Sequence, residues 1–480
     1  MQEQTVPHTH RRRGLPGLGF LLSGYVLTAT AVAGADATPP ARPTIAIVGV
    51  NVVDLERARP PALRTVLIED GRIVAVADPR HAVVPARAQR IDGRGRFLIP
   101  GLVDLHVHLF NLASRRAPND WAFPLFVANG VTAVREMSTD AAGIAQIRNW
   151  HAARERGELV APRIAAAGIA VRGESPEAAV AAVEAAADAG ADFVKVFSPL
   201  PQAQWQAVLA TAQRRGLPVV GHVPAQVALQ AAAVAGQRDN EHLMQAIEAC
   251  SSVETELLQA RAAGGQAVSE QRLDAEALQA VRQFDARRCR DVAVALAAAG
   301  QVQVPTLVLP QTEARDGAAA LSADPRWIYL RADERLRWQR AHASLTAADH
   351  RLFRARWPAL RRIASVFRRE GVELLAGTDA PMPGVYPGYS LHEELALLVA
   401  AGLSPRAALR AATLAPARLL GQDTDFGTVA VGRCADLVLL DADPTRDIGN
   451  ARRIRAVVLD GRVLTRDALD ALLADAARAQ

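Results

Sequence analysis

The sequence predicts an α/β protein: a (β/α)8 TIM barrel with a small β-sandwich domain assembled from both ends of the mature chain. Two observations lead to this prediction. The central part alternates short β-branched runs with Ala- and Leu-rich helical stretches. Near each end, two strand-like runs flank an Asp-Gly turn, at Asp70-Gly71 and at Asp460-Gly461. A chain of 480 residues, 50% of them hydrophobic, can build both domains without repeats or a disulfide framework.

The first residues are typical of an export signal. Arg11, Arg12 and Arg13 precede an apolar stretch over residues 15–35, which ends in small residues suited to cleavage near Ala35 or Ala37. The alternative is an uncleaved membrane anchor, because the stretch is long enough to span a bilayer. Its Gly, Ser and Thr interruptions favour cleavage. We therefore expect a periplasmic or secreted protein without stable membrane insertion, exported by either the Sec or the twin-arginine route.

Four segments follow from this reading of the chain. Residues 1–37 form the signal peptide, 38–98 the first part of the β-sandwich, 99–420 the barrel, and 421–480 the second part of the β-sandwich with a C-terminal helix. Reactive residues of such barrels lie at the C-terminal ends of the strands, so polar residues there are the candidates for chemistry. The eight expected strands are Leu102–Leu109, Val131–Met137, Arg163–Val171, Phe193–Ser198, Pro218–Val223, Asn240–Leu243, Val304–Leu309 and Glu373–Thr378.

The charge pattern argues against nucleic acid as a partner. The net charge is only +5, and the basic residues are interleaved with nearly as many carboxylates, without a basic run. We expect a small-molecule substrate, and a homo-oligomer is allowed. Among the 55 basic residues there is a single lysine, Lys195, which indicates that an amine is required at that position. The three cysteines permit at most one disulfide and are expected to fill the core: Cys250, Cys289 and Cys434.

Metal-ligand side chains recur at the ends of the expected strands. His106 and His108 alternate with apolar residues, so both imidazoles face the same side of their strand. Taken singly, each candidate has an ordinary interpretation, as a hydrogen-bonded core histidine or a helix cap. Their joint placement at strand ends predicts a metal centre instead. The further candidates are Lys195, His222 and His242, which close the fourth, fifth and sixth runs, and Asp379, which follows the eighth.

Seven segments of the sequence together resemble the amidohydrolase superfamily, and within it the imidazolonepropionase-like and prolidase-like dipeptidase branch. The segments that carry the resemblance are Phe97 to His108, Gly130 to Arg135, Val194 to Val196, Gly221 to Val223, Glu241 to Leu243, Gly377 to Asp379 and Gly427 to Leu439. The resemblance implies two divalent cations: one held by His106, His108 and Asp379, the other by His222 and His242. It also implies that Lys195 bridges both as a carbamate formed with carbon dioxide. An arginine could not do so, because its guanidinium stays protonated and has no lone pair.

The expected chemistry is hydrolysis of a carbon-nitrogen bond in a small amide, dipeptide-like or cyclic amide substrate. The cations would activate a shared water to a metal-bridging hydroxide and polarise the carbonyl, with Asp379 as the general base. The ligand set favours zinc over manganese or nickel. A lactonase or other ester hydrolase is the alternative within enzymes. A catalytically inactive binding protein is less favoured, because all six ligand residues are present.

The remaining candidates concern the substrate. Arg135, Phe197 and Tyr386 are the expected contacts, although Phe197 stands where related hydrolases often carry a tyrosine. Arg115 and Arg116 could also clasp a carboxylate, but with so many arginines a solvated face is the more ordinary interpretation for any of them, Arg135 included. Residues 311–369 could form a lid or a helical pair packed on the barrel wall. In residues 390–394, Ser390 and Glu393 predict a capping box rather than metal ligands.

Overall fold

The computed structural model describes residues 43–57, 59–110, 117–171, 174–263, 268–315 and 318–479. The expected signal peptide, residues 1–37, lies outside this part of the chain, and so do Arg115 and Arg116. Within the described ranges no helix combines the length and the apolar character needed to cross a bilayer.

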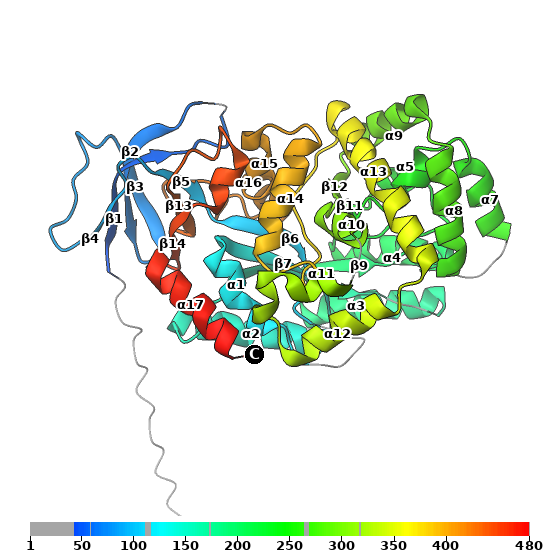
Figure 1. The fold of residues 1–480 in the computed structure, drawn as a ribbon, viewed down its shortest axis with the longest axis horizontal. Helices are drawn as coiled ribbons and strands as arrows, with labels where there is room; N and C mark the ends of the chain where they lie inside the picture. The colour runs from blue at the N-terminus through cyan, green and yellow to red at the C-terminus, as the bar shows by residue number, and fades with distance from the viewer. Residues whose placement is uncertain are drawn as a thin grey trace, which may run out of the picture. The chain divides into compact units, whose positions relative to one another are not determined.

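Strands from the two ends of the chain form one sheet, blue and orange to red in Figure 1. Its eight strands run in the order β15-β14-β13-β5-β1-β2-β3, with β4 paired to β1. The early and late parts meet where β13 pairs antiparallel with β5, Val438 opposite Ile99. The strands are β1 (Ile45–Val52), β2 (Ala62–Glu69), β3 (Arg72–Ala77), β4 (Gln89–Asp92), β5 (Phe97–Pro100), β13 (Leu437–Leu440), β14 (Ile454–Leu459) and β15 (Arg462–Thr465).

Both predicted Asp-Gly turns are present in this terminal sheet. Asp70 and Gly71 have φ of 46° and 76° between β2 and β3, and Asp460 and Gly461 have φ of 50° and 69° between β14 and β15. Two successive positive φ values match the twist of a two-residue hairpin. The sheet packs its own apolar cluster, in which Ile45, Ile68 and Leu437 are wholly buried.

The central sheet supplies the barrel wall. Five parallel strands run in the order β10-β9-β8-β7-β6, and β11 pairs with β12 in a separate two-stranded sheet. All six residues of β6 are buried, as expected of a parallel strand covered on both faces. The strands are β6 (Leu102–Val107), β7 (Val131–Thr139), β8 (Arg163–Ala170), β9 (Phe193–Val196), β10 (Val219–Gly221), β11 (Asp239–Glu241) and β12 (Val302–Val304).

Backbone hydrogen bonds connect the two pieces into a ring. The Arg238 N–H donates to the Val219 carbonyl at 2.8 Å, which joins β11 to β10. On the other side, Leu375 donates to Gln303 at 2.9 Å and Leu105 donates to Ala376 at 3.1 Å, so residues 373–378 lie between β12 and β6. The predicted α/β barrel with a terminal β domain is thereby confirmed.

The first six expected strands differ from the observed ones by a few residues at their ends, and the last two differ by more. The seventh is Val302–Val304 rather than Val304–Leu309, because Pro305 lacks an N–H for the ladder and helix α10 begins at Val308. The eighth, Glu373–Thr378, is held by isolated bridges such as Gln303 with Leu374 instead of a regular ladder.

Helices cover the outside of the barrel and fill the connections between its strands. Those up to the sixth barrel strand are α1 (Phe123–Ala128), α2 (Ala141–Arg156), α3 (Pro176–Ala189), α4 (Gln202–Arg215) and α5 (Leu229–Val234). Those that follow are α6 (Ala246–Ala249), α7 (Glu254–Ala263), α8 (Glu270–Arg282), α9 (Ala286–Ala299), α10 (Val308–Glu313), α11 (Ala318–Ala323), α12 (Ala332–Ala343), α13 (Ala347–Arg369), α14 (Tyr389–Ala400), α15 (Pro405–Ala411), α16 (Leu414–Leu419) and the C-terminal α17 (Arg466–Arg478). Three short 3-10 turns complete the described elements: η1 (Asp120–Ala122), η2 (Pro325–Tyr329) and η3 (Ile448–Arg452).

One disulfide joins two of these helical elements. Cys250, at the end of α6, is bonded to Cys289 in α9 across a sequence separation of 39 residues, and both are wholly buried. Cys434 is free. The single bridge agrees with the upper limit set by the cysteine count, and both bonded cysteines also fill the core.

Candidate metal centre

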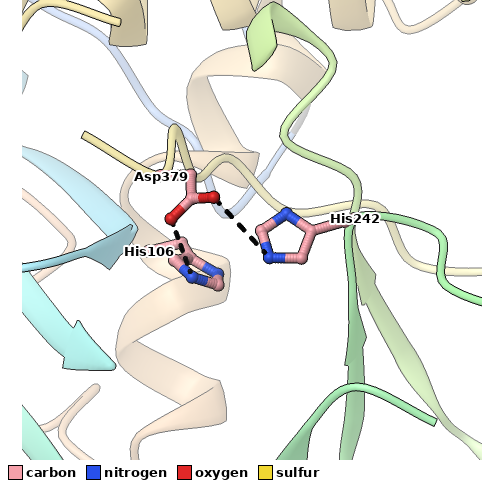
Figure 2. Close-up of side chains that lie close together, drawn as sticks. All are labelled: His106, His242 and Asp379. Carbon is pink, nitrogen blue, oxygen red and sulfur yellow. Dashed lines mark ion pairs between the residues drawn. The ribbon is translucent and has the colours of Figure 1, made fainter. Parts of the chain in front are cut away.

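The candidate site is centred on the carboxylate of Asp379. Figure 2 shows one oxygen of this carboxylate directed at His106 and the other at His242. The distances are 3.3 Å from Oδ1 to Nε2 of His106 and 3.9 Å from Oδ2 to Nε2 of His242. One ligand atom from each of the three residues lies within 4.8 Å of the others. The three come from β6, from the residue after β11 and from the loop after residues 373–378, so only the closed barrel brings them together.

His108 completes this side of the cluster. Its Nε2 lies 2.8 Å from Oδ1 of Asp379, and its side chain keeps 24% of its surface exposed, whereas that of His106 is wholly buried. Oδ1 is nevertheless a buried atom without a hydrogen-bonding partner in the described part of the chain. A buried carboxylate oxygen facing imidazole nitrogens, yet not hydrogen-bonded, is the arrangement expected of atoms that share a cation. The residues therefore fit a divalent metal.

Lys195 is the third residue of β9 and lies against the same cluster. Its Nζ is 3.3 Å from Nε2 of His106, and the residue is 1% exposed. Burial lowers the pKa of its ammonium, since taking the charge out of water is unfavourable. A lowered pKa increases the fraction of neutral amine, which is the form that reacts with carbon dioxide.

His222 approaches from β10 and is positioned by a glycine. Its ring centroid lies 5.1 Å from that of His242, and its Nδ1 lies 3.0 Å from the hydroxyl of Ser198. The preceding Gly221 has φ of +109°, and a Cβ there would come within 2.5 Å of the Val196 carbonyl oxygen. Only glycine allows β10 to pass so close to β9 and deliver the imidazole.

A buried polar network holds His106 in place. Its Nδ1 lies 2.7 Å from Oε2 of Glu241, which leaves Nε2 facing Asp379 and Lys195. The other oxygen of Glu241 accepts from Arg135, which also donates to Asp239 at 2.6 Å and to the Leu105 carbonyl at 2.6 Å. Carboxylates that orient ligand imidazoles in this way fix the tautomer and raise ligand basicity.

A second carboxylate fixes the loop that carries Asp379. Asp104 on β6 is wholly buried and accepts from the Thr378 backbone N–H at 3.0 Å and from its hydroxyl at 2.6 Å. Burial raises the pKa of Asp104 to about 7 against these hydrogen bonds. Gly377 helps as well, since a Cβ there would lie 2.6 Å from Val304 and 3.0 Å from the Cβ of His106. Asp379 itself has φ of 68° and His242 has φ of 58°, a conformation that costs a non-glycine residue on the order of 1–2 kcal/mol.

The electrostatics of the cluster favour neutral imidazoles. Burial, reinforced by the charge of Lys195, lowers the pKa of His106 and His222 well below the usual range. Burial also lowers the pKa of His242 to about 4. Burial opposes ionisation of Asp379, but its interactions with His242 and His108 outweigh this effect and lower its pKa. Neutral imidazoles and an ionised carboxylate are the protonation states in which these groups bind cations.

A cavity of about 650 Å³ opens beside this cluster and has His222 in its wall. Phe197 and Ser198 contribute from the end of β9, and Leu273 from α8. Phe197 thus lies where a substrate contact was expected, with its ring 5.1 Å from that of His222. Arg356 brings helix α13 into the same wall, so part of the segment 311–369 faces the cavity.

The same segment is also firmly packed on the barrel. Trp338 of α12 is wholly buried and donates to Glu334 at 2.9 Å and to the Pro381 carbonyl at 3.3 Å. Its ring centroid lies 5.0 Å from that of Tyr386. Trp338 is therefore packed against the barrel wall, which is one of the two alternatives for the segment 311–369. Helix α13 of the same segment borders the cavity.

Other expectations need correction or stay open. Arg135 is 1% exposed, so the solvated interpretation is wrong for it, and its place in the Glu241 network makes it a positioning residue; contact with a substrate stays a prediction. Tyr386 is buried beneath Arg326, with its hydroxyl 3.4 Å from the Leu321 carbonyl, and it does not line the cavity beside His222.

The predicted capping box at Ser390 is wrong. Helix α14 begins at Tyr389 after Gly388, which makes no side-chain cap. Ser390 instead accepts from the Tyr386 backbone N–H at 2.9 Å, while Glu393 pairs with Arg326 at 2.8 Å. As expected, however, Glu393 is not part of the ligand cluster.

The structure brings all six predicted ligand side chains together, and their binding of metal stays a prediction. Sequence reasoning missed the residues that orient them, namely Glu241, Asp239 and Asp104. A signal was present, because acidic residues adjoin the ligand motifs in Asp104-Leu105-His106 and in Asp239-Asn240-Glu241-His242. Nothing in the sequence, however, says that Glu241 reaches across the barrel to His106.

The fold and the candidate metal centre are those expected of a barrel hydrolase, and the comparison with known families agrees. Residues 97–464 match the model of the Amidohydrolase family, and the chain belongs to this family. The predicted family is therefore confirmed.

Individual relatives are more distant. A deacetylase of Agrobacterium fabrum is 38% identical over 79 residues, which span 16% of this chain and only 19% of the deacetylase. A bottromycin amidohydrolase has a similar structure, with a TM-score of 0.66, 26% identity, and coverage of 91% of this chain and 90% of the other. A Xaa-Pro dipeptidase with bound methionine has a TM-score of 0.62 at 18% identity, covering 88% of this chain and all of the other, and shows the fold alone.

Proposed function

We propose that the chain is a two-metal amidohydrolase that cleaves a carbon-nitrogen bond of a small substrate. The observation that carries the proposal is the convergence of four histidines, Lys195 and Asp379, with a buried carboxylate oxygen at the centre that makes no hydrogen bond. Membership of the amidohydrolase family and the similarity to a bottromycin amidohydrolase support the reaction class.

The chain's own residues can be assigned to the two ion positions. His106, His108 and Asp379 would hold one ion, and His222 with His242 the other, with Lys195 as a carbamate between them. Zinc suits a set of imidazoles and carboxylate-type oxygens. Divalent ions held there would supply an activated water near neutral pH and polarise the scissile carbonyl.

Asp379 is the residue placed to move the proton. Its carboxylate is ionised and lies at the centre of the cluster, so it can accept a proton from the attacking water and return it to the leaving nitrogen. Glu241 and Arg135 keep His106 oriented while this happens. The cavity beside His222 admits a small molecule, since about 650 Å³ is within the usual range of ligand pockets.

A second part of the proposal concerns the location of the mature protein. We propose that residues 1–37 are removed and that the enzyme works outside the cytoplasm. The buried Cys250–Cys289 disulfide supports this location, because such bonds persist in oxidising compartments. N-terminal sequencing of the natively produced protein tests it: a mature terminus near Asp36 or Thr38 is expected, and recovery of Met1 from a cytoplasmic fraction would contradict it.

The decisive experiment is a substrate screen of the metal-loaded mature protein. Dipeptides, N-acyl amino acids, cyclic amides and lactones are compared, with chelated protein as the control. We expect metal-dependent release of an amine from at least one amide. Turnover of lactones without any amide would assign the protein to the ester hydrolases, and turnover that survives chelation would contradict the two-metal proposal.

A further inference from the structure

Among the described residues that line the cavity beside the metal cluster, Arg356 is the one arginine, and one nitrogen of its guanidinium is buried without a hydrogen-bonding partner. Arg356 projects from α13, and its Nε is buried without a hydrogen-bonding partner. Within the described ranges no carboxylate forms an ion pair with it. At the same nitrogen, Arg261, which is buried close to the cavity, differs: its Nε donates to Glu276 at 2.6 Å, and its Nη1 donates to the Ala225 carbonyl at 2.8 Å.

A buried guanidinium nitrogen without a partner loses hydration that nothing in the protein replaces. A ligand anion would replace that hydration, and a planar guanidinium matches the two oxygens of a carboxylate. The position suits a substrate, because Arg356 shares the cavity wall with His222. It also lies close enough to His242 for its charge to act on that imidazole.

The carboxylates near Arg356 do not remove the need for an external anion. Glu313 on α10 is close enough to interact electrostatically with Arg356, and burial raises the pKa of Glu313, but the carboxylate does not hydrogen-bond to the buried Nε of Arg356. Asp274 and Glu248 also line the cavity. Glu248 faces Arg261 at 3.5 Å.

The rest of the wall is mostly apolar. The apolar side chains that line it include Phe197, Leu200, Met244, Ile247, Val268 and Leu273. A substrate that fills the cavity must therefore place an apolar group against these residues while it presents a negative charge to Arg356.

We infer that Arg356 binds a free carboxylate of the substrate, and that the substrates are amides which carry an apolar group and a free carboxylate, such as N-acylated apolar amino acids or dipeptides. This inference rests on the proposed function, because the amide carbonyl must lie at the ligand cluster while the carboxylate reaches α13. The inference places substrate specificity on α13, a helix of the segment 311–369. Arg135 is not assigned to the carboxylate, because its guanidinium already pairs with Asp239 and Glu241.

The test compares ligands that differ only in the carboxylate. The ketomethylene analogue of N-acetyl-leucine, in which a CH2 group replaces the amide nitrogen, cannot be hydrolysed. Its binding to the metal-loaded protein is measured by calorimetry, as the acid and as the primary carboxamide. We expect the acid to bind at least about tenfold more tightly, as for a charged hydrogen-bonded pair.

Variants locate this preference on the helix. Arg356→Gln should remove it, and Arg356→Lys should retain part of it. Arg351→Gln is the matched control, because Arg351 lies on the exposed side of the same helix, and it should leave the preference unchanged. Hydrolysis of N-acetyl-leucine and of N-acetyl-leucinamide is then compared in the same proteins, with KM expected to carry most of the difference.

The outcomes separate this inference from the proposed function. Equal binding of acid and carboxamide by the wild-type protein overturns the inference even if Arg356→Gln does not fold. A preference that survives in folded Arg356→Gln overturns it as well. If the preference follows Arg356 but no amide is hydrolysed at any metal loading, the anion site stands and the proposed amidohydrolase function fails.

Discussion

The terminal sheet and the metal cluster are stabilised in opposite ways. The sheet buries aliphatic side chains such as Ile45 and Ile68 and turns at Asp-Gly pairs whose conformation follows local rules. The cluster buries Lys195, Glu241 and Arg135 and holds His242 and Asp379 at positive φ. Aliphatic burial stabilises a fold whatever its ligand, whereas a buried polar cluster is unfavourable unless every group has a partner. The sheet therefore stabilises the fold, and this stability offsets the unfavourable burial of polar groups in the cluster.

The largest expected effect is at Lys195, where the cluster depends on one side chain. Lys195→Arg should lose two-metal binding and all detectable turnover, because a permanent cation repels the ions it should bridge. Lys195→Ala should regain some activity when a small carboxylate is added. Metal content by mass spectrometry of the native protein, together with turnover, checks both variants. A fully active Lys195→Arg protein with two metals would show that the lysine is not the bridge.

Because Lys195 is the single lysine, its state can be read directly. An amine-acylating reagent should modify the N-terminal amine at the same rate with and without metals, which makes that amine an internal control. Lys195 should react only after chelation, since a carbamate nitrogen is not nucleophilic. Equal labelling of Lys195 in both forms, measured by peptide mapping, would contradict the carbamate.

The terminal sheet should respond in stability alone. Ile68→Ala removes a wholly buried side chain of β2 and should lower the free energy of unfolding by about 2–5 kcal/mol. Metal content and turnover of the folded protein should stay unchanged. Val74→Ala, at a site on β3 that is 41% exposed, is the control and should have little effect. Denaturant unfolding gives the stabilities. A large loss of turnover in folded Ile68→Ala would show that the two regions are coupled.

Asp379→Asn should change the chemistry and leave the fold intact. Turnover should fall by about two or more orders of magnitude, the usual effect of removing a positioned proton carrier, with most of the metal retained. Asp475→Asn on the exposed face of α17 serves as the control and should behave like the wild type. The measurements are kcat and metal content. Near wild-type kcat with normal metal content would remove Asp379 from the proton-transfer role.

The smallest expected effect concerns a turn. Gly71 has φ of 76°, so Gly71→Ala should destabilise the protein by roughly 1–2 kcal/mol without affecting catalysis. Val83→Ala, at a site that is 84% exposed, is the control and should leave the melting temperature unchanged. Thermal unfolding distinguishes these variants. An unchanged melting temperature for Gly71→Ala would mean that the hairpin tolerates a different turn.

The sequence by itself determined the barrel, the terminal β domain and the six candidate ligand residues. Each depends on short-range information: alternation along β6 places His106 and His108 on one side, the Asp-Gly pairs specify hairpins, and a lone lysine among arginines marks a required amine. The wrong predictions also came from short-range patterns. The seventh strand ends at Val304, before Pro305, and not at Leu309 as predicted. The spacing of Ser390 and Glu393 predicted a helix cap, but the helix begins at Tyr389.

Only the tertiary structure decided which groups support the ligands and which group faces the substrate. Glu241 reaches His106 across 135 positions of sequence, and Asp104 reaches Thr378 across 274. Arg356 is one of many arginines until α13 places it, unpartnered, in the wall that His222 shares. The physical reason is that hydrogen bonds and ion pairs act over a few ångströms in space. A chain that closes a barrel brings distant residues within that range, and no local pattern records which ones meet.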